Sequence, residues 1–448
     1  MSEQHAPEHT RALRARIEAR EARVAVIGLG YVGLPLLATV IDAGFPAIGL
    51  DHDASKIERL ARGESYLPHL GIDLTRFASG DDGVRLASSS EALDDADVVL
   101  ICVPTPLRED RTPDLSAVEH ACQEIAGACA RHNRPMLVVL ESTTYPGTTR
   151  EVVSPIVCVR DGVFVAFSPE REDPGRTTHT TATIPKLVGG LDEASGALAR
   201  AFYERVVEHV VPCASAEVAE AAKLVENIYR SVNIALVNEL KVSLHAMGLD
   251  VWDVLDAAET KPFGFQRFDP GPGFGGHCVP IDPYYLSWKA SEVGAPADFV
   301  QLAGEVNRRM PRFVVDRCEE ALRARGTAFE RARVLVLGLA YKPDIADVRE
   351  SPSFELIALL RARGADAAYH DPHVPETWPG RRHDVGMRSI EWTAERLASF
   401  DAVIISTDHA WYDWRFVGEH ARLIIDTRNA MRAVTETDEG VRTKTILS

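Results

Sequence analysis

The amino-acid sequence predicts an α/β fold in which two Rossmann-like, doubly wound domains are joined by a central helical region. Short apolar runs rich in Val and Ile alternate with helical stretches in the first part of the chain and again after Arg331. Such alternation favours parallel sheets covered by helices. Between the two parts, apolar residues recur every three or four positions from Ala216 to Leu255, which is typical of a long helix.

The first α/β part follows a short charged helix expected at Arg11–Arg20. An apolar run after Arg23 opens onto a glycine turn, a helical pattern covers Leu34–Ala43, and a second strand is expected at Phe45–Leu50. This order is a βαβ unit. Further strands are expected at Val98–Val103, Met136–Leu140 and Val163–Phe167.

The second α/β part follows a helix expected at Asp298–Arg325. It begins with a strand at Arg333–Ala340 and a helix near Ser353–Arg363, and its remaining strands are expected at Ala367–His370, Ala402–Ser406 and Leu423–Asp426. The expected division is a helical leader at 1–20, a cofactor domain at 21–212, a central helical region at 213–325 and a second α/β domain at 326–448.

The overall composition is that of a soluble globular protein, with 46% hydrophobic and 26% charged residues. The net charge of −17 disfavours nucleic acid as a partner, because binding it requires basic groups that neutralise phosphates. The sequence contains no run of eighteen apolar residues, so no membrane span is predicted. The N-terminal residues lack the apolar core of a secretory signal, so a cytoplasmic location is expected. Seven irregularly spaced cysteines without a CxxC pair indicate neither a disulfide framework nor a metal site.

The glycine turn Gly28-Leu-Gly30-Tyr-Val-Gly33 fits the GxGxxG pattern between a strand and a helix. Gly28 permits the tight turn, Gly30 lets the backbone approach a pyrophosphate, and Gly33 allows close packing of helix on strand. Asp51 ends the next strand and suits the ribose hydroxyls; its charge would repel a 2′-phosphate, so NAD is favoured over NADP. The alternative is a purely structural strand–turn–helix.

A second motif places Cys278 in a loop rich in glycine, beside His277 and four residues before Asp282. A thiol next to an imidazole and near an acid is a candidate nucleophile. The alternative from this segment alone is a tight turn with an incidental cysteine.

Taken together, five ordered motifs resemble those of the UDP-glucose/GDP-mannose dehydrogenase family over almost the whole chain. These motifs are Gly28–Gly33, Cys102–Pro106, Glu141–Thr144, Lys223–Asn227 and Gly275–Cys278. The resemblance implies an N-terminal NAD domain, a central dimerisation region and a C-terminal nucleotide-sugar domain. It also implies oxidation of a sugar C6 alcohol to a carboxylate with two NAD and one water.

The resemblance implies a catalytic role for several residues. Cys278 would add to the aldehyde as a thiohemiacetal and then carry a thioester, while Lys223 and Asn227, one helical turn apart, would stabilise the developing oxyanion. Asp282 would be the acid–base group acting through a water. Glu170 and Thr143 would lie near the hydrolytic water. For Lys223 alone, a solvated helix face remains the alternative, and for Asp282 a turn before Pro283.

The resemblance also implies binding residues. For the cofactor they are Gly28, Gly30, Tyr31, Val32, Gly33, Asp51, Lys56, Thr105, Thr143 and Arg349. For the substrate they are Glu170, Lys223, Asn227, Gly275, His277, Lys342 and Arg428. Arginine and lysine suit the phosphates of both ligands.

The form Gly-His-Cys-Val-Pro-Ile-Asp-Pro around Cys278 resembles the branch that acts on N-acetylated hexosamines. It favours UDP-N-acetylglucosamine as substrate, with UDP-N-acetylmannosamine or UDP-glucose as alternatives and His277 shaping the sugar pocket. Two other classes stay open: a two-electron 3-hydroxyacid dehydrogenase and a non-catalytic NAD-binding assembly protein. The helix from Ala216 is apolar on more than one face, so a homodimer or larger even homo-oligomer is expected.

Overall fold

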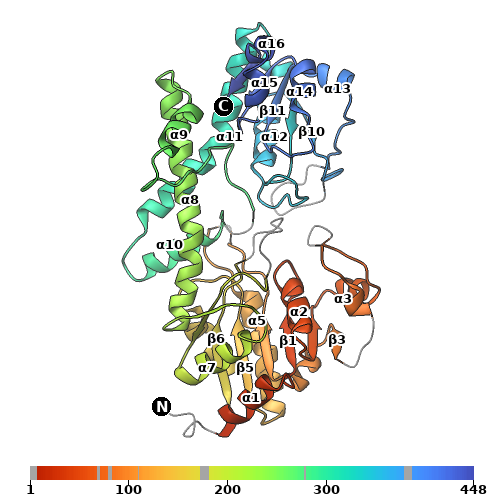
Figure 1. The fold of residues 1–448 in the computed structure, drawn as a ribbon, viewed down its shortest axis with the longest axis vertical. Coiled ribbons are helices and arrows are strands. Elements are labelled where there is room, and N and C mark those ends of the chain that lie inside the picture. The colour runs from red at the N-terminus through yellow and green to blue at the C-terminus, as the bar shows by residue number, and fades with distance from the viewer. Residues whose placement is uncertain are drawn as a thin grey trace. The chain divides into compact units, whose positions relative to one another are not determined.

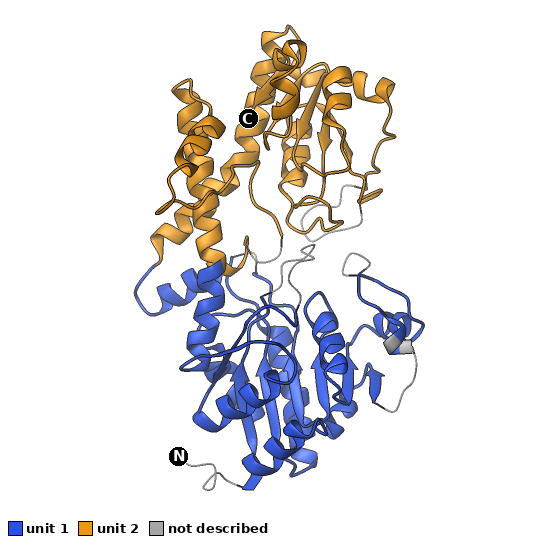
Figure 2. Ribbon diagram, in the orientation of Figure 1, with its two compact units in different colours: residues 1–226, 284–296 blue, residues 227–283, 297–448 orange. Residues whose placement is uncertain are grey.

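The computed structural model describes residues 8–67, 71–78, 83–108, 110–171, 181–276, 279–377 and 386–448. The chain forms two compact units (Figure 2). Unit 1 comprises Met1–Glu226 and Tyr284–Pro296, and unit 2 comprises Asn227–Pro283 and Ala297–Ser448. Each unit holds a sheet of mainly parallel strands, and long helices lie in the chain between the two sheets. The predicted α/β fold with two doubly wound domains and a central helical region is confirmed.

The described part of unit 1 holds an eight-stranded sheet in the order β3-β2-β1-β4-β5-β6-β7-β8 (Figure 1). All neighbours are parallel except β6 and β7, which are antiparallel. The strands are β1 (Val24–Ile27), β2 (Ala47–Leu50), β3 (Val84–Ala87), β4 (Val98–Ile101), β5 (Met136–Leu140), β6 (Val163–Phe167), β7 (Lys186–Gly190) and β8 (Val210–Pro212).

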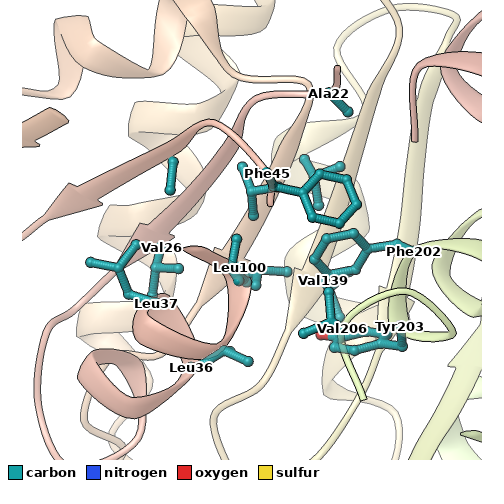
Figure 3. Close-up of a cluster of buried hydrophobic side chains, with 14 of the residues drawn as sticks. Ala22, Val26, Leu36, Leu37, Phe45, Leu100, Val139, Phe202, Tyr203 and Val206 are labelled. Carbon is teal, nitrogen blue, oxygen red and sulfur yellow. The ribbon is translucent and has the colours of Figure 1, made fainter. Parts of the chain in front are cut away.

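Helices cover the unit 1 sheet, and its central strands are therefore buried along their whole length. In β1, both alternating sets of side chains are buried, which explains its uninterrupted apolar run. One cluster of buried side chains includes Phe45 and Phe202, whose ring centroids lie 5.5 Å apart (Figure 3). The helices are α1 (Glu8–Glu18), α2 (Gly33–Asp42), α3 (Ala54–Ala61), α4 (Thr75–Ala78), η3 (Ser90–Asp95), α5 (Ser116–Arg131), η4 (Thr149–Val153), α6 (Ser154–Val157) and α7 (Glu193–Tyr203).

The described part of unit 2 holds a parallel five-stranded sheet in the order β10-β9-β11-β12-β13. Its strands are β9 (Arg333–Leu337), β10 (Asp366–His370), β11 (Ala402–Ile405), β12 (Ile424–Asp426) and β13 (Thr445–Leu447). Its helices include η5 (Phe329–Arg331), α12 (Pro352–Ala362), α13 (Ala394–Ala398), α14 (Trp414–His420), α15 (Arg432–Thr435) and α16 (Glu439–Arg442). Two separate apolar clusters bury β9, β11 and β12.

The central helices differ in one respect from the expected pattern. The prediction of one continuous helix from Ala216 to Leu255 is wrong, because this segment forms two separate helices, α8 (Ala216–Ala246) and α9 (Val251–Glu259). Gly248 has φ of +76°, which favours glycine and ends the helix, and Asp250 then caps α9 through the amide of Trp252. The other expected central helix is confirmed as α11 (Asp298–Ala324).

Several elements lie where the sequence analysis places none. They include α10 (Asp282–Glu292), in which Pro283 occupies the first turn, and the β7, α7 and β8 segment of unit 1. Pro is well suited to a first helical turn, since its missing N–H has no helical partner there. None of the helices in the described ranges is both long and apolar enough to cross a bilayer.

Candidate active site

The glycine turn between β1 and α2 has the geometry of a dinucleotide turn. Gly28 has φ of +89°, and a Cβ there would lie 2.6 Å from the Cys102 carbonyl oxygen; a Cβ at Gly33 would lie 1.9 Å from the Gly28 oxygen. A Cβ at Gly30, in contrast, would meet no protein atom of the described chain within 4 Å. Gly28 and Gly33 are thus required by packing, whereas Gly30 borders open space for a ligand. Helix α2 begins at Gly33 without a side-chain cap from Val32, which suits phosphate binding by its first amides.

Asp51, directly after β2, fastens this turn. Its Oδ2 accepts from the Leu29 amide and the Lys56 ammonium, both at 2.9 Å, and its Oδ1 accepts from the Asp53 amide at 2.9 Å. Oδ1 therefore keeps acceptor capacity for a ribose hydroxyl. The structure brings the predicted cofactor residues Asp51 and Lys56 together at the turn.

The ends of β4 and β5 bring two more predicted residues together. The Thr105 hydroxyl donates to the Thr143 carbonyl at 2.8 Å, and the Tyr285 hydroxyl of α10 donates to the Thr105 carbonyl at 2.7 Å. Carboxyl ends of neighbouring parallel strands form the usual ligand edge of such sheets. Tyr285 is a fully buried residue that the sequence analysis does not single out.

Next to this edge lies a buried ion pair that sequence reasoning also misses. The Lys186 ammonium lies 2.5 Å from Glu141 Oε2 and donates to the Pro169 carbonyl at 3.1 Å, while the Tyr203 hydroxyl donates to Glu141 Oε1. Burial raises the pKa of Glu141, and the Lys186 charge opposes that rise. The pair fixes the backbone just before Glu170, and it has no local signal because Glu141 and Lys186 are far apart in sequence.

A small pocket of unit 1 joins these groups. It extends from the start of α2 to the predicted catalytic carboxylate, and its described lining is Val32, Leu36, Glu141, Glu170, Arg171, Thr181, Ile184, Pro185 and Lys186. The pocket therefore places a predicted cofactor contact, Val32, and the predicted catalytic Glu170 in one cavity.

Helix α8 carries the predicted catalytic cation. Lys223 is 4% exposed, and its ammonium lies 3.4 Å from a Glu170 carboxylate oxygen. A solvated helix face, the alternative for Lys223, is therefore wrong. One turn further, in unit 2, the Asn227 amide donates to Asp282 Oδ2 at 2.6 Å. Asp282 is buried and starts α10, so it is not a residue of an exposed turn.

Glu220, one turn before Lys223, anchors α8 inside unit 1. Its side chain is fully buried and accepts from the Gly147 amide at 2.6 Å, the Thr149 amide at 2.8 Å and the Thr149 hydroxyl at 2.6 Å. The loop that it holds continues from Thr143. Glu220 thus links the cofactor edge to the helix that presents Lys223. Its only sequence signal is an acidic residue three positions before that lysine.

In unit 2 the glycine-rich loop packs closely on the second sheet. A Cβ at Gly275 would lie 2.6 Å from Tyr341 Cβ, and the Gly276 amide donates to the Arg349 carbonyl at 2.9 Å. A Cβ at Gly271 would lie 2.5 Å from the Arg428 guanidinium, whose Nε donates to the Ser406 carbonyl at 2.8 Å. The glycine-rich loop therefore carries Gly275 and, at Gly271, contacts Arg428, which follows β12; both Gly275 and Arg428 are predicted to bind substrate.

The other predicted residues of unit 2 are less closely grouped. Lys342 follows the carboxyl end of β9. Arg349 pairs with Asp347 at 2.6 Å, so its contact with the cofactor stays a prediction. His277 and Cys278 lie outside the described residues. In unit 1, Tyr31 follows Gly30 in the glycine turn.

Unit 2 also contains a second turn of the same kind, not identified from the sequence. Gly338 follows β9 with φ of +83°, and Ala340 stands where the first turn has Gly30. Asp371, after β10, accepts from the amides of Leu339 and Ala340 at 2.7 and 2.9 Å. It also accepts from His373 N at 2.8 Å, Val374 N at 3.1 Å and His409 Nε2 at 3.1 Å. Five donors therefore saturate this acid.

Substitutions in the first turn should separate folding from cofactor binding. Gly30→Ala should keep the thermal midpoint but weaken NAD by about 1–3 kcal/mol, roughly 5- to 150-fold in Kd, because the methyl group fills the ligand's space. Gly28→Ala is the matched comparison and should lower stability by about 1–3 kcal/mol, through its positive φ and the clash with Cys102. Thermal unfolding and NAD titration measure both; equal NAD affinity in Gly30→Ala and the parent would contradict the prediction.

The contribution of Glu220 to stability should depend on pH. Burial raises its pKa to about 7, against the opposing effect of its hydrogen bonds to Thr149 and Gly147. Because this exceeds the unfolded value, the stabilisation is full below about pH 4.5 and is lost as the pH rises through about 7. The free-energy difference between the parent and Glu220→Gln should therefore fall by up to about 3 kcal/mol across that range.

Thermal unfolding of both proteins at several pH values measures this difference. Glu217→Gln is the control, since Glu217 lies on the same helix but pairs with Arg150 at the surface. Against the effect of burial, hydrogen bonds with Ser215 and Arg150 lower the pKa of Glu217, so its contribution to stability should not fall as the pH rises. A pH-independent difference for Glu220→Gln would show that its carboxyl titrates normally.

Comparison with known proteins agrees with this geometry. Three models of the UDP-glucose/GDP-mannose dehydrogenase family match the chain: the NAD binding domain at residues 22–207, the central domain at 217–309 and the UDP binding domain at 335–433. The chain is 34% identical over 424 residues to the UDP-N-acetyl-D-mannosamine dehydrogenase of Pyrococcus horikoshii, covering 92% of this chain and 96% of that one. It is 31% identical over 398 residues to the UDP-N-acetyl-D-glucosamine 6-dehydrogenase of Pseudomonas aeruginosa, covering 87% and 91%.

A solved structure of the UDP-D-ManNAc dehydrogenase from Pyrococcus horikoshii is also similar. It superimposes with a TM-score of 0.81 at 32% identity and covers 91% of this chain and 96% of that one. The glycine turn, the buried Lys223 and the second sheet thus occur in the expected order along matched domains. The chain belongs to the UDP-glucose/GDP-mannose dehydrogenase family and is an NAD-dependent nucleotide-sugar dehydrogenase.

Proposed function

We propose that the chain oxidises the C6 hydroxyl of a UDP-N-acetylhexosamine to a carboxylate in two steps. UDP-N-acetylmannosamine is the first candidate substrate, because several of the relatives bear the name UDP-N-acetyl-D-mannosamine dehydrogenase. UDP-N-acetylglucosamine, favoured by the loop around Cys278, comes second because one relative with that activity in its name is similarly distant. UDP-glucose is the third candidate.

The observation that carries the proposal is the buried Lys223 ammonium beside Glu170 in the unit that holds the glycine turn. A cation fixed away from water stabilises an alkoxide or oxyanion that develops on the sugar. Its neighbouring carboxylate balances the charge in the free enzyme and is positioned to accept a proton. Such a pair suits alcohol and aldehyde chemistry, and a non-catalytic NAD-binding protein would not require it.

The cofactor site fits NAD in the open space at Gly30, the uncapped start of α2 and the acceptor capacity of Asp51. When bound, NAD accepts a hydride from C6 in each oxidation. We assign to Cys278 the retention of the aldehyde: its thiolate adds to the C6 carbonyl carbon, and Lys223 with Asn227 stabilises the oxygen. Loss of the second hydride leaves a thioester on the same sulfur.

Hydrolysis completes the proposed sequence. Glu170 or the Asn227-bonded Asp282 takes a proton from water, the water oxygen adds to the thioester carbon, and the C–S bond breaks. The Cys278 thiol is restored and the sugar leaves as a carboxylate. Each sugar thus consumes one water and delivers two hydrides.

We also propose that the chain is divided into domains at residues 21–212, 213–325 and 326–448, and that the nucleotide sugar binds to the last of these domains.

Counting NADH per sugar tests this function. The enzyme is assayed with each of four nucleotide sugars, in the presence of NAD or of NADP: UDP-N-acetylmannosamine, UDP-N-acetylglucosamine, UDP-glucose and GDP-mannose. One of the two N-acetylhexosamine substrates should be oxidised with NAD and should give two NADH per sugar. Cys278→Ser should lower turnover at least about 1000-fold, whereas Cys158→Ser, at an exposed cysteine, should not. One NADH per sugar, or full turnover in Cys278→Ser, would refute the thiol mechanism; no turnover with any sugar would favour an NAD-binding assembly protein.

We further propose that α8 mediates a homodimer or a larger even assembly. Val218, Val225, Tyr229, Leu236 and Leu240 are each at least 40% exposed and recur at seven- and four-residue intervals, so they form one stripe along the helix. An apolar stripe of this length is unfavourable in water. Light scattering should show that Leu236→Asp dissociates the assembly. The control is Val159→Asp, which changes a similarly exposed apolar residue away from α8 and should leave the assembly intact. Equal masses for both variants would exclude the stripe as the interface.

A further inference from the structure

A cluster of three residues of types that bind metals lies on unit 1 outside the site described above. His52 follows Asp51 at the carboxyl end of β2, and His120 and Glu124 lie four residues apart on one face of α5. One ligand atom from each residue lies within 4.8 Å of the others. His52 Nε2 is 3.2 Å from Glu124 Oε2, and His120 Nδ1 is 3.9 Å from the same oxygen.

These distances approach those of a zinc site. Ligand atoms about 2.0–2.1 Å from a tetrahedral zinc lie roughly 3.4 Å apart, close to the separation of His52 from Glu124. Two imidazoles and one carboxylate are also a frequent set of zinc ligands, with the fourth position left to water. We propose that His52, His120 and Glu124 bind a divalent transition-metal ion such as Zn²⁺.

The exposure of the three side chains is compatible with this assignment. Glu124 is 13% exposed, whereas the His52 and His120 side chains are 53% and 60% exposed, so an ion can reach both imidazoles from solvent. His52 lies within hydrogen-bonding distance of Glu124, whereas His120 Nδ1 is too far from the carboxylate for a hydrogen bond. The two imidazole rings contact each other edge to face, with their centroids 5.2 Å apart. A cation between the three groups would engage both imidazoles and the carboxylate at once.

A second cluster, in unit 2, provides a useful contrast. Asp344, His373 and His409 also lie close together, but the Asp344 amide donates to His409 Nδ1 at 2.9 Å. The other nitrogen, Nε2, faces Asp371 at 3.1 Å. Both nitrogens of His409 are therefore engaged, and the imidazole has no lone pair to give to a metal. At the unit 1 cluster, no such amide bond to His52 or His120 is found among the described residues.

Calorimetric titration of Zn²⁺ tests the site. The full chain carrying Cys278→Ser serves as the parent, so that the active-site thiol does not compete for zinc. The titration is carried out in mildly alkaline buffer, because a metal ligand must be deprotonated to bind. The parent should bind one equivalent, and adding His120→Ala should weaken binding by at least about 10- to 100-fold, as loss of even an outer-shell partner does. His209→Ala, at an exposed histidine of the same unit, is the matched control and should change nothing.

Glu124→Gln provides a second variant in case His120→Ala fails to fold, which its thermal midpoint without metal would reveal. With Co²⁺ in place of Zn²⁺, the parent and the His209→Ala control should develop the intense visible bands of a four-coordinate ion, and both cluster variants should lose them. The proposal is overturned if the parent binds no zinc, or if the cluster variants bind it as tightly as the control. Binding is measured without substrate or NAD, so the result is independent of the proposed activity.

Discussion

The hydrogen bonds of the buried Glu220 carboxyl group are the interaction on which the candidate site of unit 1 depends. The carboxyl group joins α8 to the loop between Gly147 and Thr149 through three donors, and it does so with no water-exposed surface. An unmet donor in such a place costs about 1–3 kcal/mol. The loop and the helix are therefore fixed to each other, and Lys223, one turn along α8, is fixed with them. The predicted cofactor edge and the predicted catalytic cation are therefore held in place by the same set of hydrogen bonds.

A second buried pair, Lys186 with Glu141, supports the same region. Lys186 holds the Pro169 carbonyl while it pairs with Glu141, so the backbone leading to Glu170 is attached to β5 and β7. Breaking a buried pair by removing one partner is far costlier than the pair is worth. The pair therefore holds the backbone next to Glu170. Glu220 holds the helix that carries Lys223, so both sides of the Lys223–Glu170 contact start from buried hydrogen bonds.

The sequence predicts well those features that depend on neighbouring residues. The β-branched run before Gly28, the acid at Asp51 and the helical spacing of α11 are local patterns, and the structure confirms the elements that they predict. The prediction fails where apolar spacing continues across a break, as at Gly248, where a positive φ ends α8. It cannot find Glu220, Lys186 or Tyr203, because their partners are tens of residues away and only the folded sheet brings them together. The same holds for His52 and His120, which no spacing rule connects.

Asp51 and Asp371 occupy equivalent places in the two sheets, and the number of donors around each distinguishes their uses. Asp51 receives three hydrogen bonds from the described chain and retains a lone pair, while Asp371 receives five and has none. In the second sheet the Asp371 carboxylate only stabilises the protein, and a nucleotide bound there must contact other residues. A glycine turn followed by an acid is therefore an incomplete signature of dinucleotide binding in any α/β protein. Dinucleotide binding also requires that the acid keeps a lone pair that the protein does not use, and only the folded structure shows whether it does.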